Sequence, residues 1–175
     1  MTTKTTTVLD ARAVERTLKR MSVEIVELNR GTDDLIVVGI QRRGVQLADR
    51  IVKMIDGGEG VAVPQGSLDI TLYRDDLQTI GPRPVVGPTY LPWDIDGQHI
   101  VIVDDVLYTG RTLAFCLQPF LSVLVRKLQV AVLVDRNHPR YPVAADYKGY
   151  ELSTTLTDHV EVVLSDPERE GIYLR

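Results

Sequence analysis

The chain has 175 residues, of which 44% are hydrophobic and 25% charged, and its formal net charge is −4. This length predicts one domain, 1–175, and the proportions are ordinary for a soluble globular enzyme. The acidic balance argues against a global basic field for nucleic acid, and the single cysteine argues against an internal disulfide. With no signal peptide and no apolar segment long enough to span a membrane, we expect a cytoplasmic protein.

The chain should begin with a frayed Thr-rich segment that ends near Val8, followed by a helix over 11–29. Asp10 is a suitable N-cap for this helix and Gly31 a suitable C′ residue. Apolar residues recur along it at spacings of three and four: Val14, Leu18, Met21, Ile25 and Leu28. Four basic residues lie off this stripe and predict a solvated face, with a phosphate-binding patch as the alternative: Arg12, Arg16, Lys19 and Arg20.

The first strongly apolar strand is predicted over 35–40, and a helix over 45–55 follows it. The connecting loop, 39–44, holds two arginines between two glycines. Because the loop joins a strand end to a helix start, the arginines predict an anion site more readily than a solvated turn. The glycine-rich run 57–60 predicts a flexible turn.

Residues 68–73 predict another strand, which leads into Arg74. The segment 77–92 then contains four prolines and two glycines, a density that excludes a helix or a central strand. A long loop of this kind in a compact domain is typical of a lid over a site, so we expect a flexible flap over about 74–92. Disorder without function is the alternative.

Residues 101–112 hold the most informative stretch of the sequence. The apolar, β-branched run 100–103 predicts a strand buried on both faces, and Asp104 and Asp105 close it. A short turn leads to Thr109-Gly110-Arg111-Thr112, which predicts a helix start suited to a phosphate. Two vicinal carboxylates can accept hydrogen bonds from neighbouring hydroxyls or hold a hydrated cation. Together these features predict a site for ribose 5-phosphate.

The last third of the chain predicts a helix over about 111–125 that Pro119 must kink or shorten, and then a buried strand over 128–134. Residues 139–159 should be irregular, with short strands at 160–164 and 172–174. Strands that alternate with helices predict an α/β fold with a mainly parallel central sheet flanked by helices. No dinucleotide, P-loop or zinc motif occurs, and His138 has no partner at a ligand spacing.

Three stretches resemble the PyrR family of type I phosphoribosyltransferases: 69–77, which reads Asp-Ile-Thr-Leu-Tyr-Arg-Asp-Asp-Leu, the 103–112 motif, and Leu-Val-Asp-Arg at 133–136. The resemblance covers roughly 8–164. It implies the type I phosphoribosyltransferase fold, with a small irregular hood and a flap, and two roles. These are uracil phosphoribosyltransferase activity, which uses phosphoribosyl pyrophosphate (PRPP), and attenuation of pyrimidine genes through RNA.

The resemblance also implies roles for individual residues. Asp104, Asp105 and Arg74 would be catalytic, with the two aspartates near Mg²⁺ through water or substrate oxygens. Arg136 and Val160 would help to hold uracil or UMP. The PRPP-binding loop would consist of Val106, Leu107, Tyr108, Thr109, Gly110, Arg111 and Thr112, and the pyrophosphate loop of Arg42, Arg43 and Gly44. The implied partners are PRPP, uracil and UMP, with pyrimidine-operon leader RNA as a further candidate, in a homo-oligomer (dimer or tetramer).

The chain departs from the family pattern in several places. Arg42 replaces a usual Thr, and the stretch 113–128 is apolar nearly all round. This stretch predicts a buried helix, an interface, or an altered reading of the gene. Val23 replaces a common His, and Asn-His-Pro-Arg at 137–140 replaces Gly-His-Arg-Glu, so we expect weak RNA binding. The alternative functions are an RNA-binding nucleotide sensor with little catalysis, and a phosphoribosyltransferase for another base.

Overall fold

The computed structural model describes residues 5–70, 91 and 94–175. Arg74 and nearly all of the predicted flap lie outside these ranges. The centre of the fold is a five-stranded parallel sheet in the order β3-β2-β4-β5-β6. Its strands are β2 (Leu35–Ile40), β3 (Gln65–Leu68), β4 (His99–Leu107), β5 (Lys127–Asp135) and β6 (Tyr147–Glu151).

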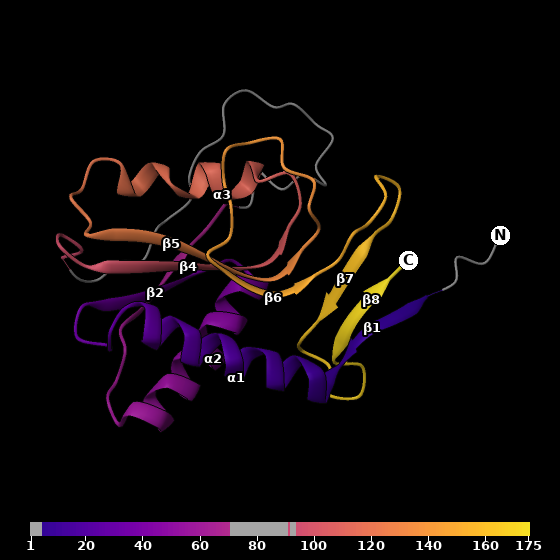
Figure 1. Cartoon of the computed structure of the whole chain (residues 1–175), viewed down its shortest axis with the longest axis horizontal. Helices are drawn as coiled ribbons and strands as arrows, with labels where there is room; N and C mark the ends of the chain where they lie inside the picture. Colours follow the sequence, from indigo (N-terminus) through magenta and orange to yellow (C-terminus); the bar gives the residue numbers. More distant parts are fainter. Residues whose placement is uncertain (1–4, 71–90, 92–93) are drawn as a thin grey trace.

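Helices cover both faces of this sheet, as Figure 1 shows. Helices α1 (Ala11–Leu28) and α2 (Arg43–Glu59) lie on one face, and α3 (Arg111–Cys116) with the 3₁₀ turn η1 (Gln118–Phe120) lies on the other. A hydrophobic core lies on each face of the sheet, and β4 contributes to both because its side chains point alternately to the two faces. Val101 and Val103 pack with α1 and α2, while Ile100 and Ile102 pack with α3 and η1. A strand buried on both faces explains the unbroken β-branched run in its sequence.

A second sheet of three antiparallel strands stands at one end of the molecule, in the order β1-β8-β7 (Figure 1). It joins the first strand, β1 (Thr6–Asp10), to the last two, β7 (Val160–Val163) and β8 (Gly171–Leu174). The first and the last strand of the described chain, β1 and β8, therefore lie side by side (Figure 1). This sheet forms the hood, and it is a regular structure because β8 pairs on both sides.

Several predictions about single elements are confirmed. Strand β2 has the predicted bounds, and α1 begins where Asp10 accepts a hydrogen bond of 2.8 Å from the Ala13 N–H. Pro119 does shorten the predicted 111–125 helix, which ends at Cys116 and continues only as η1. The left-handed residue that directly follows the α1 cap is Arg30, with Gly31 after it, so the predicted C′ position was one residue late.

Other predictions were wrong in their bounds. Strand β4 does not close at Asp104 but runs on to Leu107, because β5 continues to pair with it as far as Asp135. The predicted glycine turn at 57–60 belongs to α2 up to Glu59, and only Gly60 adopts the left-handed conformation. Strand β3 covers 65–68 and so meets the predicted strand 68–73 only at Leu68, while residues 71–73 of that prediction lie outside the described residues. Strands β1 and β6 occupy segments that we expected to be frayed or irregular. Among the described residues, no helix is long and apolar enough to cross a membrane.

Candidate functional site

A cavity of about 510 Å³ lies beyond the carboxyl ends of β2, β4 and β5. Ligands of open α/β sheets bind in this position because loops from several strands meet there. Its walls come from four segments that are distant in the sequence. They are Ile40 and Arg43, then Asp104, Asp105, Val106, Tyr108 and Thr112, then Arg136, and finally Leu156, Thr157, Asp158, His159 and Val160.

The two aspartates lie inside β4, not in a turn after it. Asp104 is only 8% exposed, and its Oδ1 accepts a 2.9 Å hydrogen bond from the Asp105 N–H. Asp105 is half-buried, and its Oδ1 accepts a 2.9 Å bond from the Val106 N–H. The Arg43 Nη1 lies 3.5 Å from the Asp105 Oδ2. The strand thus presents two carboxylates side by side, with a guanidinium at the outer one.

The start of α2 approaches β4 very closely, which brings Arg43 to the site. A Cβ atom on Gly44 would lie 2.4 Å from the Val103 carbonyl oxygen and 3.3 Å from the Asp104 Cα. A Cβ on Gly39 would meet Val45 Cα at 2.5 Å. Only glycine fits at either place, because every other residue carries that atom. The two glycines that flank the arginines therefore let the β2–α2 turn fold against the end of β4.

The turn between β4 and α3 is fixed from two directions. Gly110 precedes α3 with a φ of 86°, a conformation that favours glycine, and the Arg111 N–H donates to the Thr109 Oγ1 at 3.3 Å. The Thr109 carbonyl accepts hydrogen bonds from the N–H groups of Arg140 and Tyr141, at 2.9 and 3.2 Å. The loop after β5 thus supports the loop after β4.

Arg136 is the most deeply buried cation of the described residues, at 6% exposed. Its Nε donates to the Thr154 Oγ1 at 3.0 Å, and its Nη2 donates to the carbonyls of Thr155 and Asp158 at 3.2 and 2.8 Å. Its Cζ lies 4.0 Å from the centre of the Tyr108 ring. Burial lowers the pKa of Arg136, and the electrostatic interactions with Tyr108 and Asp158 offset only part of this effect. The side chain stays charged, because an arginine pKa starts above 12.

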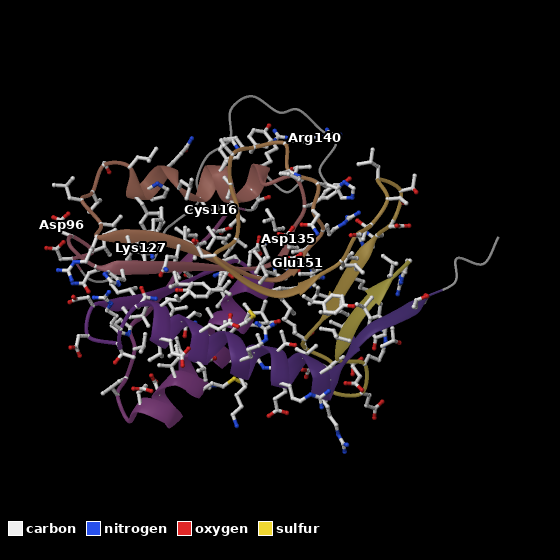
Figure 2. The ribbon with its side chains drawn as sticks, in the orientation of Figure 1. Asp96, Cys116, Lys127, Asp135, Arg140 and Glu151 are labelled. Atoms are coloured by element: carbon white, nitrogen blue, oxygen red, sulfur yellow. The ribbon has the colours of Figure 1, made fainter. Side chains whose placement is uncertain are left out.

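Two further carboxylates hold the loops around Arg136. The Asp158 Oδ2 accepts a 2.7 Å bond from the Thr155 N–H, and this hydrogen bonding lowers the pKa of Asp158. The buried Asp135 at the end of β5 accepts from the Asn137 N–H at 2.9 Å and pairs with Lys148 at 3.0 Å. Figure 2 shows Asp135 close to Glu151 and at the opposite end of β5 from Lys127.

The structure brings together most of the residues that we predicted for the site. Eight of them line the one cavity: Arg43, Asp104, Asp105, Val106, Tyr108, Thr112, Arg136 and Val160. Five others flank it without lining it: Arg42, Gly44, Leu107, Thr109 and Gly110. Arg111 is exposed at the start of α3, and Arg74 lies outside the described residues. The roles of these residues remain predictions.

Sequence reasoning missed the wall formed by residues 156–159 and the contact of Arg136 with Tyr108. The segment 139–159 has no apolar periodicity and carries no motif of a binding site, so the residues alone gave no signal of the wall. Only the PyrR resemblance pointed there, through Val160. Cys116 is no nucleophile, because burial and then the charge of Asp104 raise the pKa of its thiol far above its ordinary value.

The site fits Mg²⁺ through its oxygen donors. Asp104 and Asp105 offer adjacent carboxylates, which suit a hard cation. Within the ranges that the structure describes, no three His, Cys, Asp or Glu side chains gather around a metal position. Two carboxylates without a closed cage suit an ion that keeps its waters and takes further oxygens from a substrate.

Comparisons with known proteins place this geometry in a family. Residues 4–168 match the phosphoribosyl transferase domain family. The bifunctional protein PyrR of Pelotomaculum thermopropionicum is 46% identical over 164 residues, which covers 93% of this chain and 91% of that protein. The bifunctional protein PyrR of Thermus thermophilus is 46% identical over 163 residues, covering 93% and 90%.

Solved structures agree on the fold. The hypoxanthine phosphoribosyltransferase of Trypanosoma cruzi, a mutant in a ternary substrates complex, superposes with a TM-score of 0.73 at 19% identity. That match covers 95% of this chain and 92% of the other. A hypoxanthine-guanine phosphoribosyltransferase of Bacillus anthracis gives 0.70 at 17% identity, covering 85% and 84%. The predicted fold class is therefore confirmed, and the chain belongs to the PyrR family of type I phosphoribosyltransferases.

Proposed function

We propose that this protein transfers the phosphoribosyl group of PRPP to uracil, which forms UMP and pyrophosphate. The observation that carries the proposal is the meeting of Asp104, Asp105, Arg43 and the 156–160 wall around one cavity of about 510 Å³. Membership of the PyrR family supports uracil as the base. In the reaction, a uracil nitrogen forms a bond to C1 of the ribose while the bond from C1 to the pyrophosphate oxygen breaks, and the proton of that nitrogen is released to water.

Asp104 and Asp105 would hold the ribose. Their carboxylates are fixed by main-chain N–H groups at 2.9 Å, so each oxygen has a defined direction before the substrate arrives. Such oxygens can accept hydrogen bonds from the two ribose hydroxyls, and negative charge near C1 stabilises the positive charge that develops as pyrophosphate departs. The turn 108–112 would bind the 5-phosphate at the other side of the sugar.

Arg43 would serve the leaving group. Its guanidinium pairs with Asp105 at 3.5 Å, and its side chain is 44% exposed. A weak, half-exposed pair can be exchanged for a pyrophosphate at little cost. Arg42 next to it would add a second positive charge near the departing anion.

The wall 156–160 would hold uracil and keep water away from C1. Arg136 uses its Nε hydrogen and both Nη2 hydrogens on the loop 154–158, so Nη1 is the part of its guanidinium available to a ligand. Asp104 and Asp105 would hold Mg²⁺, which when bound would neutralise negative charge on the pyrophosphate. Arg74 belongs to the proposal as a further catalytic residue.

The test is a panel of bases, each mixed with the protein, PRPP and Mg²⁺, with release of pyrophosphate as the measurement. We expect uracil to react about tenfold faster than cytosine, hypoxanthine or guanine, or faster still. A faster reaction with a purine would replace uracil as the substrate and keep the reaction type. Release from none of the bases would refute the transferase proposal.

The second candidate function is regulation of pyrimidine genes through leader RNA, with UMP as the signal. Relatives that are named bifunctional favour it, and so do three exposed basic residues on α1: Arg12, Arg16 and Lys19. Arg20 is engaged with Glu24 at 2.8 Å and with two carbonyls of β6. Arg136 is buried and Lys148 is paired, so neither adds to an RNA-binding face.

We further propose a homo-oligomer, a dimer or a tetramer, in the cytoplasm. Two strongly exposed leucines support the assembly: Leu121 and Leu124 are 78% and 86% exposed. The apolar stretch 113–128, for which a buried helix was one of the predictions, is thus only partly buried. Light scattering after gel filtration measures the assembly, and a monomer at micromolar concentration would contradict it.

A further inference from the structure

Arg136 and His138, in the turn after β5, both contact Tyr108 and Thr154. Arg136 lies against the Tyr108 ring at 4.0 Å and donates to the Thr154 Oγ1 at 3.0 Å. His138 lies 5.6 Å from Tyr108, ring centre to ring centre, at an interplanar angle of 80°, and its Nε2 bonds the Thr154 carbonyl. Since a carbonyl only accepts, the His138 Nε2 carries the hydrogen.

The turn is built to place these two side chains on the same side. Asn137 between them has a φ of 58°, a left-handed conformation that asparagine tolerates. Its N–H donates to Asp135 at 2.9 Å, which fixes the turn at the end of the strand. Asp135 in turn pairs with Lys148 on β6 at 3.0 Å. The pair Arg136 and His138 is therefore held by the central sheet.

The two neighbours belong to two different segments around the cavity. Tyr108 belongs to the turn that would bind the 5-phosphate, and Thr154 begins the segment that leads to the wall 156–160. Arg136 extends the connection along that segment, with bonds to the carbonyls of Thr155 and Asp158. Arg136 and His138 therefore connect the turn 108–112 to the segment 154–158.

We infer that Tyr108, Arg136 and His138 form a loop clamp, in which His138 is a positioning residue that sets the spacing between the turn 108–112 and the wall 156–160. The inference rests on the proposed transferase function and adds His138 to it. The clamp aligns the uracil nitrogen with C1 of PRPP, and a misplacement of about 1 Å in such an arrangement can cost on the order of 100-fold in rate. His138 itself does not line the cavity.

The first test measures the clamp without any substrate. Hydrogen exchange of the 154–158 amides is compared in the wild-type protein, in His138→Ala, and in Arg140→Gln as the control. Arg140 is exposed on the same turn, and Figure 2 shows it beside the top of the fold. We expect exchange about tenfold faster in His138→Ala and unchanged exchange in Arg140→Gln. Equal exchange in all three proteins would overturn the clamp, whatever the enzyme does.

The second test is kinetic and separates positioning from folding. We expect His138→Ala to lower kcat about tenfold, with KM for PRPP and for uracil changed by less than about threefold and a melting temperature still above the assay temperature. His138→Gln, which keeps an N–H donor for Thr154, should recover part of the rate. The variant that combines His138→Ala with Tyr108→Leu should be no slower than the slower of the two single variants. Each substitution breaks the same connection between the turn 108–112 and the wall 156–160, so their effects should not add.

The kinetic outcomes distinguish the two proposals. An unchanged kcat in His138→Ala, or additive losses in the combined variant, would overturn the positioning role while the transferase proposal stands. If the wild-type protein transfers phosphoribose to no base, the transferase proposal fails, and the exchange experiment alone decides the clamp.

Discussion

Gly44→Ala tests how closely α2 must approach β4 for the site to exist. The added Cβ would lie 2.4 Å from the Val103 carbonyl oxygen, whereas ordinary contacts begin at 3.4 Å, so a backbone segment must move by about 1 Å. Such overpacking costs roughly 1–3 kcal/mol. The gain from replacing a helical glycine offsets about 0.5–1 kcal/mol of this. We therefore expect a net loss of up to about 2.5 kcal/mol, or up to about 10 °C in melting temperature for a domain of this size.

Gly44→Ala should lose most of its activity even though the protein stays folded. The atoms in the way are the Val103 oxygen and the Asp104 Cα, so relief of the clash moves Arg43 away from Asp105 or displaces the carboxylates. We expect kcat/KM for PRPP to fall about 10–100-fold, in a protein that is fully folded at the assay temperature. Calorimetry and steady-state UMP formation are the two assays.

Gly57→Ala is the matched control, because Gly57 lies in the same helix and a Cβ added there would have nothing within 4 Å. This variant should gain about 0.5–1 kcal/mol and keep its activity. If Gly44→Ala melts and turns over like Gly57→Ala, the close approach of α2 to β4 is not required and the reasoning fails.

Three more predictions follow from the site and its supports. Replacing Asp104 and Asp105 together by Asn should leave a folded protein, since an amide oxygen can still accept the N–H bonds, but lower turnover about 100-fold or more; near-normal UMP formation would refute their assignment. Hydrogen bonds that the Lys148 ammonium donates to Asp135, and then to Glu151, raise the pKa of Lys148 above its ordinary 10.5, so its contribution to stability is complete below pH 10.5 and disappears as the pH rises through the raised pKa. Urea denaturation should show Lys148→Met less stable than wild type by about 1–3 kcal/mol at pH 7, and a difference that persists at about pH 12 would contradict the pairing. A pyrimidine-operon leader hairpin should bind weakly at near-physiological salt, because Val23 is exposed where the family offers a His; tight, UMP-enhanced binding that a scrambled hairpin lacks would show otherwise.

The sequence alone determined the elements whose signals are local. The apolar run before Asp104 predicted a strand buried on both faces, and the spacing of apolar residues predicted α1 almost to the residue. Asp10 and Pro119 marked a helix start and a helix end, because capping and the missing N–H act within one turn. The motif at 103–112 pointed to the family that the comparisons then confirmed.

Tertiary structure decided what depends on pairing between distant segments. Strand β4 continues through Asp104 and Asp105 only because β5 pairs with it up to Asp135, and no local signal in the polar residues shows this. The hood exists because the two ends of the chain meet as β1 and β8. Arg136 looked like a residue for the ligand, yet its hydrogen bonds go mainly to the loop that completes the cavity. Contacts between residues distant in the sequence decide these features, because a backbone N–H or carbonyl bonds with whichever partner the fold brings within reach.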